Sequence, residues 1–168
     1  AFDWTGLTSL HLPENLEEIG HNAFSSNAEL QEVTFPKNLW VIPTDMLYNC
    51  SALEKVVLPE QLERIEASAF AYCAGGCAVS GQKRIRALRT VELSPNQPLL
   101  TVQDGMLIDH VHQRVLRRLT TDAVCIVPEG IKEIADGAFG RIPELTEITL
   151  PDSCILIPLF LQPRFHRR

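Results

Sequence analysis

The segment Leu12–Pro36, LPENLEEIGHNAFSSNAELQEVTFP, decides the fold because its pattern recurs along the chain. Prolines stand 23 residues apart in two runs, and each is followed by an aliphatic residue at its third position and isoleucine at its sixth in most copies. An Ala-Phe pair or a substitute for it ends at the eleventh position, and alternating apolar residues precede the next proline. The prolines are Pro13, Pro36, Pro59, Pro128 and Pro151. A short repeat of constant period is the signature of a solenoid.

Each repeat predicts a short strand, a proline turn and a curved return. Val33 and Phe35 alternate with polar residues, as in a strand with one buried face. Proline lacks a backbone donor, so Pro36 ends the strand and turns the chain. After each proline we expect a short strand or 3₁₀ segment, and then one or two helical turns around Ala23-Phe24 and its equivalents. Because one repeat cannot enclose a core alone, successive coils must stack.

Two stretches break the period. An insertion at about residues 75–87 delays the strand that ends the third repeat, and residues 94–127 replace a regular repeat. Within the second stretch, Gln103-Asp104-Gly105 is a turn signal beside short apolar runs, which predicts a β-hairpin. We expect one solenoid domain over residues 1–157 and a C-terminal tail or cap over residues 158–168, where the Ala-Phe pair is missing.

The net charge of −6 conceals a basic middle segment. Residues 1–70 carry eleven acidic and three basic side chains, whereas residues 71–120 carry three acidic and seven basic ones. The seven predict either a patch for an acidic partner or a solvated face, and they are Lys83, Arg84, Arg86, Arg89, Arg114, Arg117 and Arg118. Nucleic acid is not the expected partner, because no aromatic residues are interleaved with these charges.

The ends of the chain and its hydropathy bear on location. No apolar run approaches the roughly 20 residues that cross a bilayer, so no membrane span is expected. Ala1-Phe2 aligns with Ala23-Phe24, and we therefore expect the chain to be a piece of a longer repeat array.

LPENLEEIGHNAF, YNCSAL at Tyr48–Leu53 and VPEGIKEIADGAF together resemble the BspA-type leucine-rich repeat. The resemblance covers about residues 1–157 and includes the interruption after Ser94, which resembles the hairpin-bearing variant repeat of that family. It implies an α/β, right-handed leucine-rich-repeat solenoid with short parallel strands, short helical turns and one β-hairpin insertion. Family members are typically surface or secreted proteins that bind other proteins without catalysis. The resemblance thus implies a protein partner and an extracellular or cell-surface location.

The side chains that could carry chemistry have structural explanations. Cys50 and Cys73 share the fourteenth position after their prolines, and Cys125 and Cys154 replace core aliphatic residues. We expect free thiols throughout, with a Cys50–Cys73 disulfide as the alternative and Cys77 outside the pattern. His110 and His112 flank one residue and lack a third ligand, so we expect no metal and no cofactor. No catalytic triad or phosphate-binding loop is present, and an enzyme is not expected.

The outward residues of the strands form the candidate binding surface. If the strands stack in parallel, the second and fourth residues before each proline align on the face that is concave in such solenoids. The expected ladder is His11, Glu32, Thr34, Lys55, Val57, Thr90, Glu92, Val124, Ile126, Glu147 and Thr149. Val57, Val124 and Ile126 are its apolar members. The ladder is either a contact surface or a solvated sheet face without a ligand.

These features favour a non-catalytic protein-interaction module from an adhesin-like surface or secreted protein. The alternative is a structural or scaffold subunit that packs its open N-terminal coil on another chain.

Overall fold

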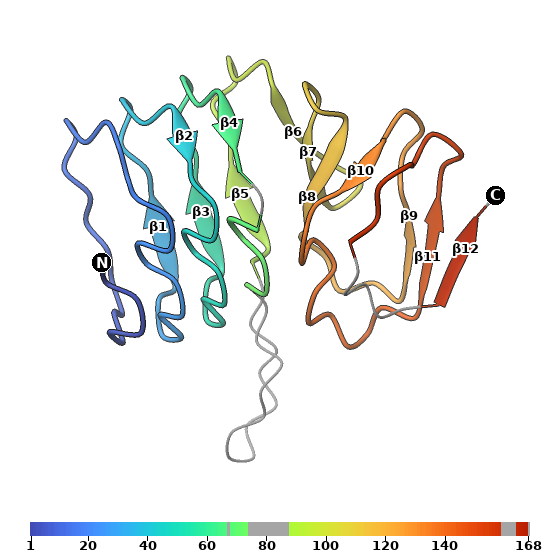
Figure 1. Cartoon of the computed structure of the whole chain (residues 1–168), viewed down its shortest axis with the longest axis horizontal. Helices are drawn as coiled ribbons and strands as arrows, with labels where there is room; N and C mark the ends of the chain where they lie inside the picture. The colour runs from blue at the N-terminus through green and yellow to red at the C-terminus, as the bar shows by residue number, and fades with distance from the viewer. Residues whose placement is uncertain (67, 74–87, 159–163, 168) are drawn as a thin grey trace.

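The structure, a computed structural model, describes residues 1–66, 68–73, 88–158 and 164–167. The coils stack side by side from the N-terminal end to β12 (Figure 1). The strands are β1 (Glu32–Thr34), β2 (Val41–Ile42), β3 (Lys55–Val57), β4 (Arg64–Ile65), β5 (Thr90–Glu92), β6 (Leu100–Gln103), β7 (Met106–Asp109), β8 (Arg114–Arg118), β9 (Val124–Ile126), β10 (Glu133–Ile134), β11 (Glu147–Leu150) and β12 (Arg164–Arg167). The expected insertion at about residues 75–87 lies outside the described residues.

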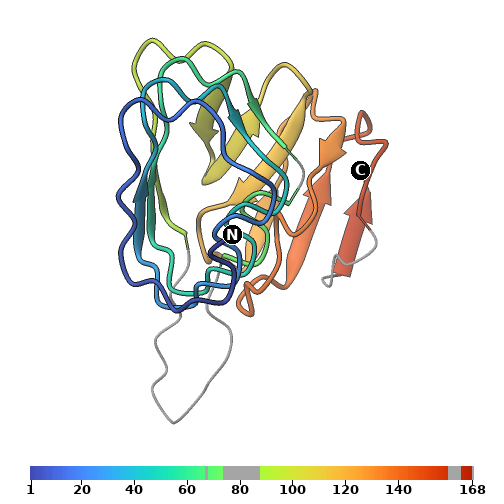
Figure 2. The same cartoon turned by 60° about the vertical axis from the view of Figure 1, so that its left-hand side comes forward.

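Strands from successive repeats pair in parallel on two sides of each coil. β1, β3 and β5 form one sheet in which Val33, Val56 and Val91 are in register. β2 and β4 pair on the other side with Ile42 opposite Ile65 (Figure 2). Both rows keep the repeat period, because residues 23 positions apart become partners in these pairs. The parallel stack that the repeat predicts is therefore present.

Turns replace the expected helices in the described residues, where no helix occurs. A helix requires negative φ at every residue, but φ is positive at the ninth and thirteenth positions of each regular repeat. These residues are Asn22, Ser26, Asp45, Asn49, Ser68, Tyr72, Gly137 and Arg141. The turned backbone bonds to the next coil instead, as when Ser26 N donates to Tyr48 O (2.7 Å) and Asn49 N to Ala71 O (2.9 Å). The helical part of the α/β expectation is thus not found in the described residues. These residues also contain no helix that is long and apolar enough to cross a membrane.

The predicted hairpin lies within residues 94–127, spans residues 100–118 and has one strand more than the sequence indicates. β6 and β7 pair antiparallel across Asp104-Gly105, and β7 pairs antiparallel with β8. β8 then pairs in parallel with β10, so the hairpin joins the row of short strands on one side of the stack. The opposite side receives no strand from it. The sheet that contains β1 therefore ends at β5, and a separate sheet begins at β9.

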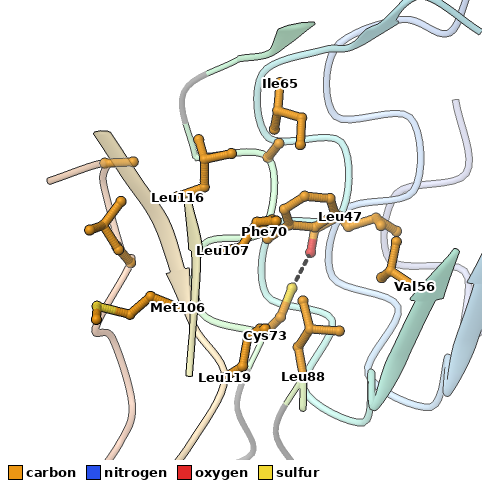
Figure 3. Close-up of a cluster of buried hydrophobic side chains, with 14 of the residues drawn as sticks. Leu47, Val56, Ile65, Phe70, Cys73, Leu88, Met106, Leu107, Leu116 and Leu119 are labelled. Carbon is orange, nitrogen blue, oxygen red and sulfur yellow. Dashed lines mark hydrogen bonds between the residues drawn. The ribbon is translucent and has the colours of Figure 1, made fainter. Parts of the chain in front are cut away.

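The hydrophobic core continues through this interruption. Phe70 and Cys73 lie in one cluster with Leu107 and Leu119 of the hairpin repeat (Figure 3). Met106 and Leu107 are fully buried. The sheet that ends at β5 and the sheet that begins at β9 are not joined by strand pairing. Side-chain packing in the core connects these two parts of the stack.

The C-terminal segment returns to the stack. Leu156 forms a parallel bridge with Glu133, and the backbone of β12 pairs in parallel with β11. β9, β11 and β12 thus make the third parallel row. The predicted division between a domain over residues 1–157 and a tail or cap over residues 158–168 stays a prediction.

Candidate partner-binding site

The outward side chains of β1, β3 and β5 form two rows in register. Glu32, Lys55 and Thr90 are direct partners in one row, and Thr34, Val57 and Glu92 in the other. Strand alternation explains the arrangement, because the intervening Val33 and Val56 are fully buried. All six outward residues are at least partly exposed. This set, which we call the first ladder, is the largest aligned group of the expected site residues.

Lys55 lies at the electrostatic centre of the first ladder. Its Nζ is 3.0 Å from Glu32 Oε1 and 3.1 Å from Glu92 Oε1, so one cation links three strands. The hydrogen bonds that Lys55 donates to Glu32 and then to Glu92 raise the pKa of Lys55, which keeps the amine charged. The two carboxylates remain half exposed at 53% each. They are therefore available to a partner while their charges hold Lys55 in place.

The remaining expected ladder residues form a second, separate group. Val124 pairs with Glu147 and Ile126 with Thr149 across β9 and β11, and we call these four the second ladder. Val124 and Ile126 are 50% and 54% exposed, although both are large and apolar. β5 and β9 do not pair, because the strands of the intervening repeat join the other side of the stack. The expectation of one continuous ladder is therefore wrong.

His11 stands apart from the first ladder. The segment Thr8–Leu12 lies beside β1 but is not a strand, and no backbone hydrogen bond joins it to β1. A groove separates them and is lined by residues 8–12, Glu14, Gln31, Glu32 and residues 34–36. The side chain of His11 thus lines this groove instead of extending the aligned rows.

The structure contradicts the expected basic patch at its three arginines in β8. Arg114, Arg117 and Arg118 are 9%, 0% and 4% exposed. Arg114 binds the Asp109 carboxylate through Nε (3.1 Å) and the Ile65 carbonyl oxygen, and Arg118 binds Asp104 O at 3.3 Å. These groups bind several of the guanidinium donors inside the molecule, whereas Arg117 Nε and Arg118 Nε have no hydrogen-bond partner among the described residues. Arg89 is exposed, and Lys83, Arg84 and Arg86 lie outside the described residues.

Arg117 is buried without a carboxylate partner among the described residues. Its guanidinium donates to Gly137 O at 2.5 Å and to Gly140 O at 3.2 Å. Burial lowers the pKa of Arg117 from its ordinary value to about 10. The residue remains charged at neutral pH and fastens β8 to the turn of the following repeat.

The described cysteines, Cys50, Cys73, Cys125 and Cys154, are free and buried. Cys50 Sγ donates to Phe24 O (3.3 Å) and Cys73 Sγ to Leu47 O (3.0 Å), in each case across one coil. Burial raises the pKa of Cys73 to about 11 and that of Cys50 as well. These thiols therefore act as neutral hydrogen-bond donors in the core, and Cys77 lies outside the described residues.

The two hairpin histidines have different partners. His110 Nε2 lies 2.7 Å from Thr101 Oγ1, whereas His112 Nδ1 lies 2.8 Å from Asp109 Oδ2. No group of three or more potential metal-ligating side chains occurs among the described residues. Both histidines thus serve the hairpin itself in this structure.

Asn27 is a structural residue that the sequence analysis did not single out. Its side chain is fully buried, and Nδ2 donates to Phe2 O at 2.8 Å and Phe24 O at 2.9 Å. Oδ1 accepts from Leu7 N and Thr5 Oγ1, both at 3.0 Å. Asn27 occupies the same repeat position as Cys50 and Cys73. The presence of a polar residue at a position that is cysteine in two other repeats was the sequence signal that could have identified it.

The stacked parallel strands and their outward ladders define a solenoid of the leucine-rich repeat class. The model of the BspA type leucine rich repeat region matches residues 1–90 and 119–160 in 6 copies. The chain therefore belongs to the BspA type leucine-rich repeat family, as the resemblance in its sequence indicated.

Solved structures show the same fold. The pneumococcal vaccine antigen PcpA has a TM-score of 0.73 and 24% sequence identity, over 89% of this chain and 35% of that chain. A leucine rich cell surface protein from Faecalibacterium prausnitzii has a TM-score of 0.55 and 18% identity, over 78% and 38% of the two chains. A leucine-rich repeat protein from Eubacterium ventriosum has a TM-score of 0.56 and 16% identity, over 76% and 37%.

This chain thus matches little more than a third of the length of each of these proteins. No curated protein sequence matches it.

Proposed function

We propose that the chain is a non-catalytic protein-interaction module and that a partner protein binds across the first ladder. The observation that carries the proposal is the register of exposed charged, polar and apolar side chains over three paired strands. A paired sheet holds these side chains at fixed positions, so little conformational entropy is lost when a partner binds. Val57 places an apolar contact among Glu32, Lys55 and Glu92, which suits the mixed surface of a protein interface.

The second ladder supplies a further contact area in this proposal. Val124 and Ile126 are exposed beside the partly exposed Glu147 and Thr149. Exposed aliphatic pairs on a strand favour interaction with an apolar surface. A partner that engages both ladders must span the interruption at the hairpin repeat.

We also propose that the protein acts as an adhesin-like molecule at the cell surface or in the extracellular space. The proposal is supported by two structural neighbours, one described as a cell surface protein and one as a vaccine antigen. It agrees with the protein-binding role that the family resemblance implies.

A charge exchange tests the first ladder directly. Purified extracellular matrix and serum proteins are arrayed and probed with the wild-type chain and with the double variant Lys55→Glu/Glu92→Lys, which has the same net charge. We expect at least one saturable partner of the wild type, and a loss of affinity of about tenfold or more in the variant.

The matched control is Glu17→Lys/Lys37→Glu, which exchanges one acidic and one basic residue that are both exposed outside the ladders. Its binding should equal that of the wild type. Equal binding by the Lys55→Glu/Glu92→Lys variant would show that the first ladder is not the contact surface.

One observation favours a scaffold role as the second candidate. Phe2 and Trp4 are 52% and 75% exposed in the first coil, and the centroid of the Phe2 ring lies 5.8 Å from that of Phe24, on which it stacks. In this role the first coil packs on another chain. Sedimentation equilibrium should then show self-association of the purified chain, or a complex when the partner chain is added. A stable monomer whose state is unchanged by Trp4→Ser would exclude packing of copies through this end.

A further inference from the structure

The backbone of β1 is paired on one side only. Phe35 N donates to Val57 O (3.1 Å) and Lys55 N to Gln31 O (3.2 Å), so the peptide groups of residues 31 and 35 face β3. Alternate residues of a strand direct their peptide groups to opposite neighbours. The peptide groups of Glu32 and Thr34 therefore face the groove beside Thr8–Leu12.

This open side departs from the rest of the stack. Gln31 O accepts from the amides of Glu54 and Lys55, and Ala123 O accepts from those of Thr146 and Glu147. Thr8 holds the same repeat position as Gln31, yet no backbone hydrogen bond joins it to β1 in the described residues. The first coil is attached before and after this point, where Leu7 N donates to Asn27 Oδ1 and Asn22 N to Thr44 O.

The separation extends along the next part of the same segment. A second groove lies between residues 17–19 and the residues Trp40, Val41 and Pro43. Glu63 N and Arg64 N both donate to Trp40 O, but no equivalent backbone bond reaches Glu17 O from the part of the chain that the structure describes. The backbone of residues 8–19 thus forms a strap without backbone hydrogen bonds to the second coil in the described residues, although its side chains Leu10, Leu12 and Ile19 pack against the core. Figure 1 shows the strap as a plain tube beside β1.

The groove beside β1 has a mixed lining and an acidic setting. Leu10, Leu12 and Phe35 provide apolar surface, while Glu14 and Glu32 provide carboxylates. Residues 1–36 contain six acidic side chains and neither lysine nor arginine. An open strand edge of this kind recognises extended backbone, and its charge favours basic side chains.

We propose that the open edge of β1 binds an extended, basic segment of a partner protein as an added strand in this groove. The amides and carbonyl groups of Glu32 and Thr34 pair with the incoming backbone, as in other cases of strand addition. Every second side chain of the segment meets the apolar lining, and the others meet the acidic rim. This site shares Glu32 and Thr34 with the first ladder, but it uses the open backbone edge of β1 instead of the outward face of the sheet. It does not depend on the proposed function.

The experiment uses the whole chain and a fluorescein-labelled heptapeptide of alternating lysine and valine. Fluorescence polarisation should show saturable binding that weakens with added salt. Hydrogen exchange measured by NMR should show that the Glu32 and Thr34 amides exchange rapidly in the free protein and slow on peptide addition. The Val33 amide, which faces β3, should be slow in both states.

Two matched comparisons isolate the backbone contact. Thr34→Pro removes the amide that faces the groove and should weaken binding about tenfold or more, whereas Thr34→Ala keeps that amide and should stay within about twofold. Two further peptides carry N-methyl groups at alternate residues, one at the odd positions and one at the even positions. The peptide whose methylated amides face β1 should bind weakly, and the other should bind normally. A thermal melt of each variant verifies that it is folded.

Several results would overturn the proposal. The absence of saturable binding, or equal binding by Thr34→Pro and the wild type, would remove strand addition. Slow exchange of the Glu32 and Thr34 amides in the free monomer would show that Thr8–Leu12 itself occupies the edge. Protection of these amides that depends on protein concentration would assign the edge to a second copy of the chain.

Discussion

The fourteenth position of each early repeat shows how one residue serves the stack. Asn27, Cys50 and Cys73 each donate a side-chain hydrogen bond to a carbonyl group of the preceding coil. A buried carbonyl group without a partner costs about 1–3 kcal/mol, so this position requires a small donor. A thiol meets that requirement while remaining compatible with an apolar core.

Cys73 should therefore be inert and should make stability depend on alkaline pH. Burial raises its pKa to about 11 from an ordinary value of 9.0. Between these values the folded chain holds the proton and the unfolded chain releases it, so the free energy of unfolding should fall as pH rises from about 9 to 11. The loss is on the order of 3 kcal/mol.

Denaturant titrations across this pH range measure that slope, with Cys73→Ala as the control in which it should be shallower. Mass spectrometry after alkylation should find Cys73 modified only in the unfolded chain. Rapid modification of the folded chain at neutral pH would contradict its assignment as a protected thiol.

Gly137 is fixed by both conformation and space. Its φ is +65°, and an added Cβ would lie 2.6 Å from the Cβ of Ala71. Gly137→Ala should lower the free energy of unfolding by about 2–4 kcal/mol, which combines backbone strain with overpacking. Gly130 has a φ of +85° but nothing within 4 Å, so Gly130→Ala should cost only about 1–2 kcal/mol. Equal losses in chemical denaturation would mean that contact with Ala71 is not limiting.

The sequence assigns many residues correctly and fails at the arginines. Cys50, Cys73, Cys125 and Cys154 could be placed in the core because they share positions with apolar or buried residues. Arg117 could not be placed there, since the groups that accept its hydrogen bonds are the carbonyl oxygens of Gly137 and Gly140. Every residue has a backbone carbonyl group, so the sequence does not show which of them accept hydrogen bonds from a buried arginine. A buried cluster of basic residues therefore looks the same in the sequence as an exposed one.

Among the elements, the hairpin is held by a buried ionic group. Asp109 is 3% exposed, and its Oδ2 lies 2.8 Å from His112 Nδ1 and 3.1 Å from Arg114 Nε. Asp109→Ala should lower the free energy of unfolding by about 3–5 kcal/mol, because the buried charge of Arg114 loses its partner.

Asp122 provides the comparison in an exposed setting. Its side chain is 73% exposed and 3.3 Å from Arg118 Nη2. Asp122→Ala should change stability by less than about 1 kcal/mol. Similar losses for the two variants in urea titrations would contradict the buried ion pair at Asp109.

The sequence predicts strands better than the segments that connect them. Strand register follows from the 23-residue period, and β1 with β3 is an example. The turns around Phe24 were expected to be helical because apolar spacing there is compatible with a helical turn. Their positive φ values at Asn22 and Ser26 depend on the hydrogen bonds that these amides donate to carbonyl groups of the next coil, which local sequence does not specify.

At the scale of the molecule, the hairpin repeat is the connection between two groups of coils. β5 and β9 do not pair, so the core side chains of the hairpin must transmit stability between the groups. Leu107 is fully buried in that core. Leu107→Ala should cost about 2–5 kcal/mol and should increase amide exchange in both β3 and β11.

Val33→Ala is the control near the N-terminal end, and it should increase exchange mainly in β1 and its neighbours. Hydrogen exchange with mass spectrometry distinguishes the two patterns. An effect of Leu107→Ala that is confined to the hairpin would show that the two groups of coils unfold independently.

The whole-molecule shape explains why the candidate site was predicted only in part. Repeat positions gave the rows of the first and second ladders, but the period contains no information about which side of the stack β8 joins. That choice depends on β8 pairing with β10. It divides the expected surface between Glu92 and Val124.

The thirteenth position of the repeat has a further consequence for how such proteins diversify. Trp4, Ser26, Asn49, Tyr72 and Arg141 share a left-handed backbone there, with φ between 57° and 60°. Side chains that differ this much in size and charge occupy one conformation, and at Trp4, Ser26 and Asn49 a backbone hydrogen bond to the next coil supports it. Random mutation at this position can therefore alter the row of side chains at the turn edge, where Arg141 lies over the Tyr72 ring, without disturbing how the coils are built. A library varied there would change surface chemistry while inheriting an intact scaffold.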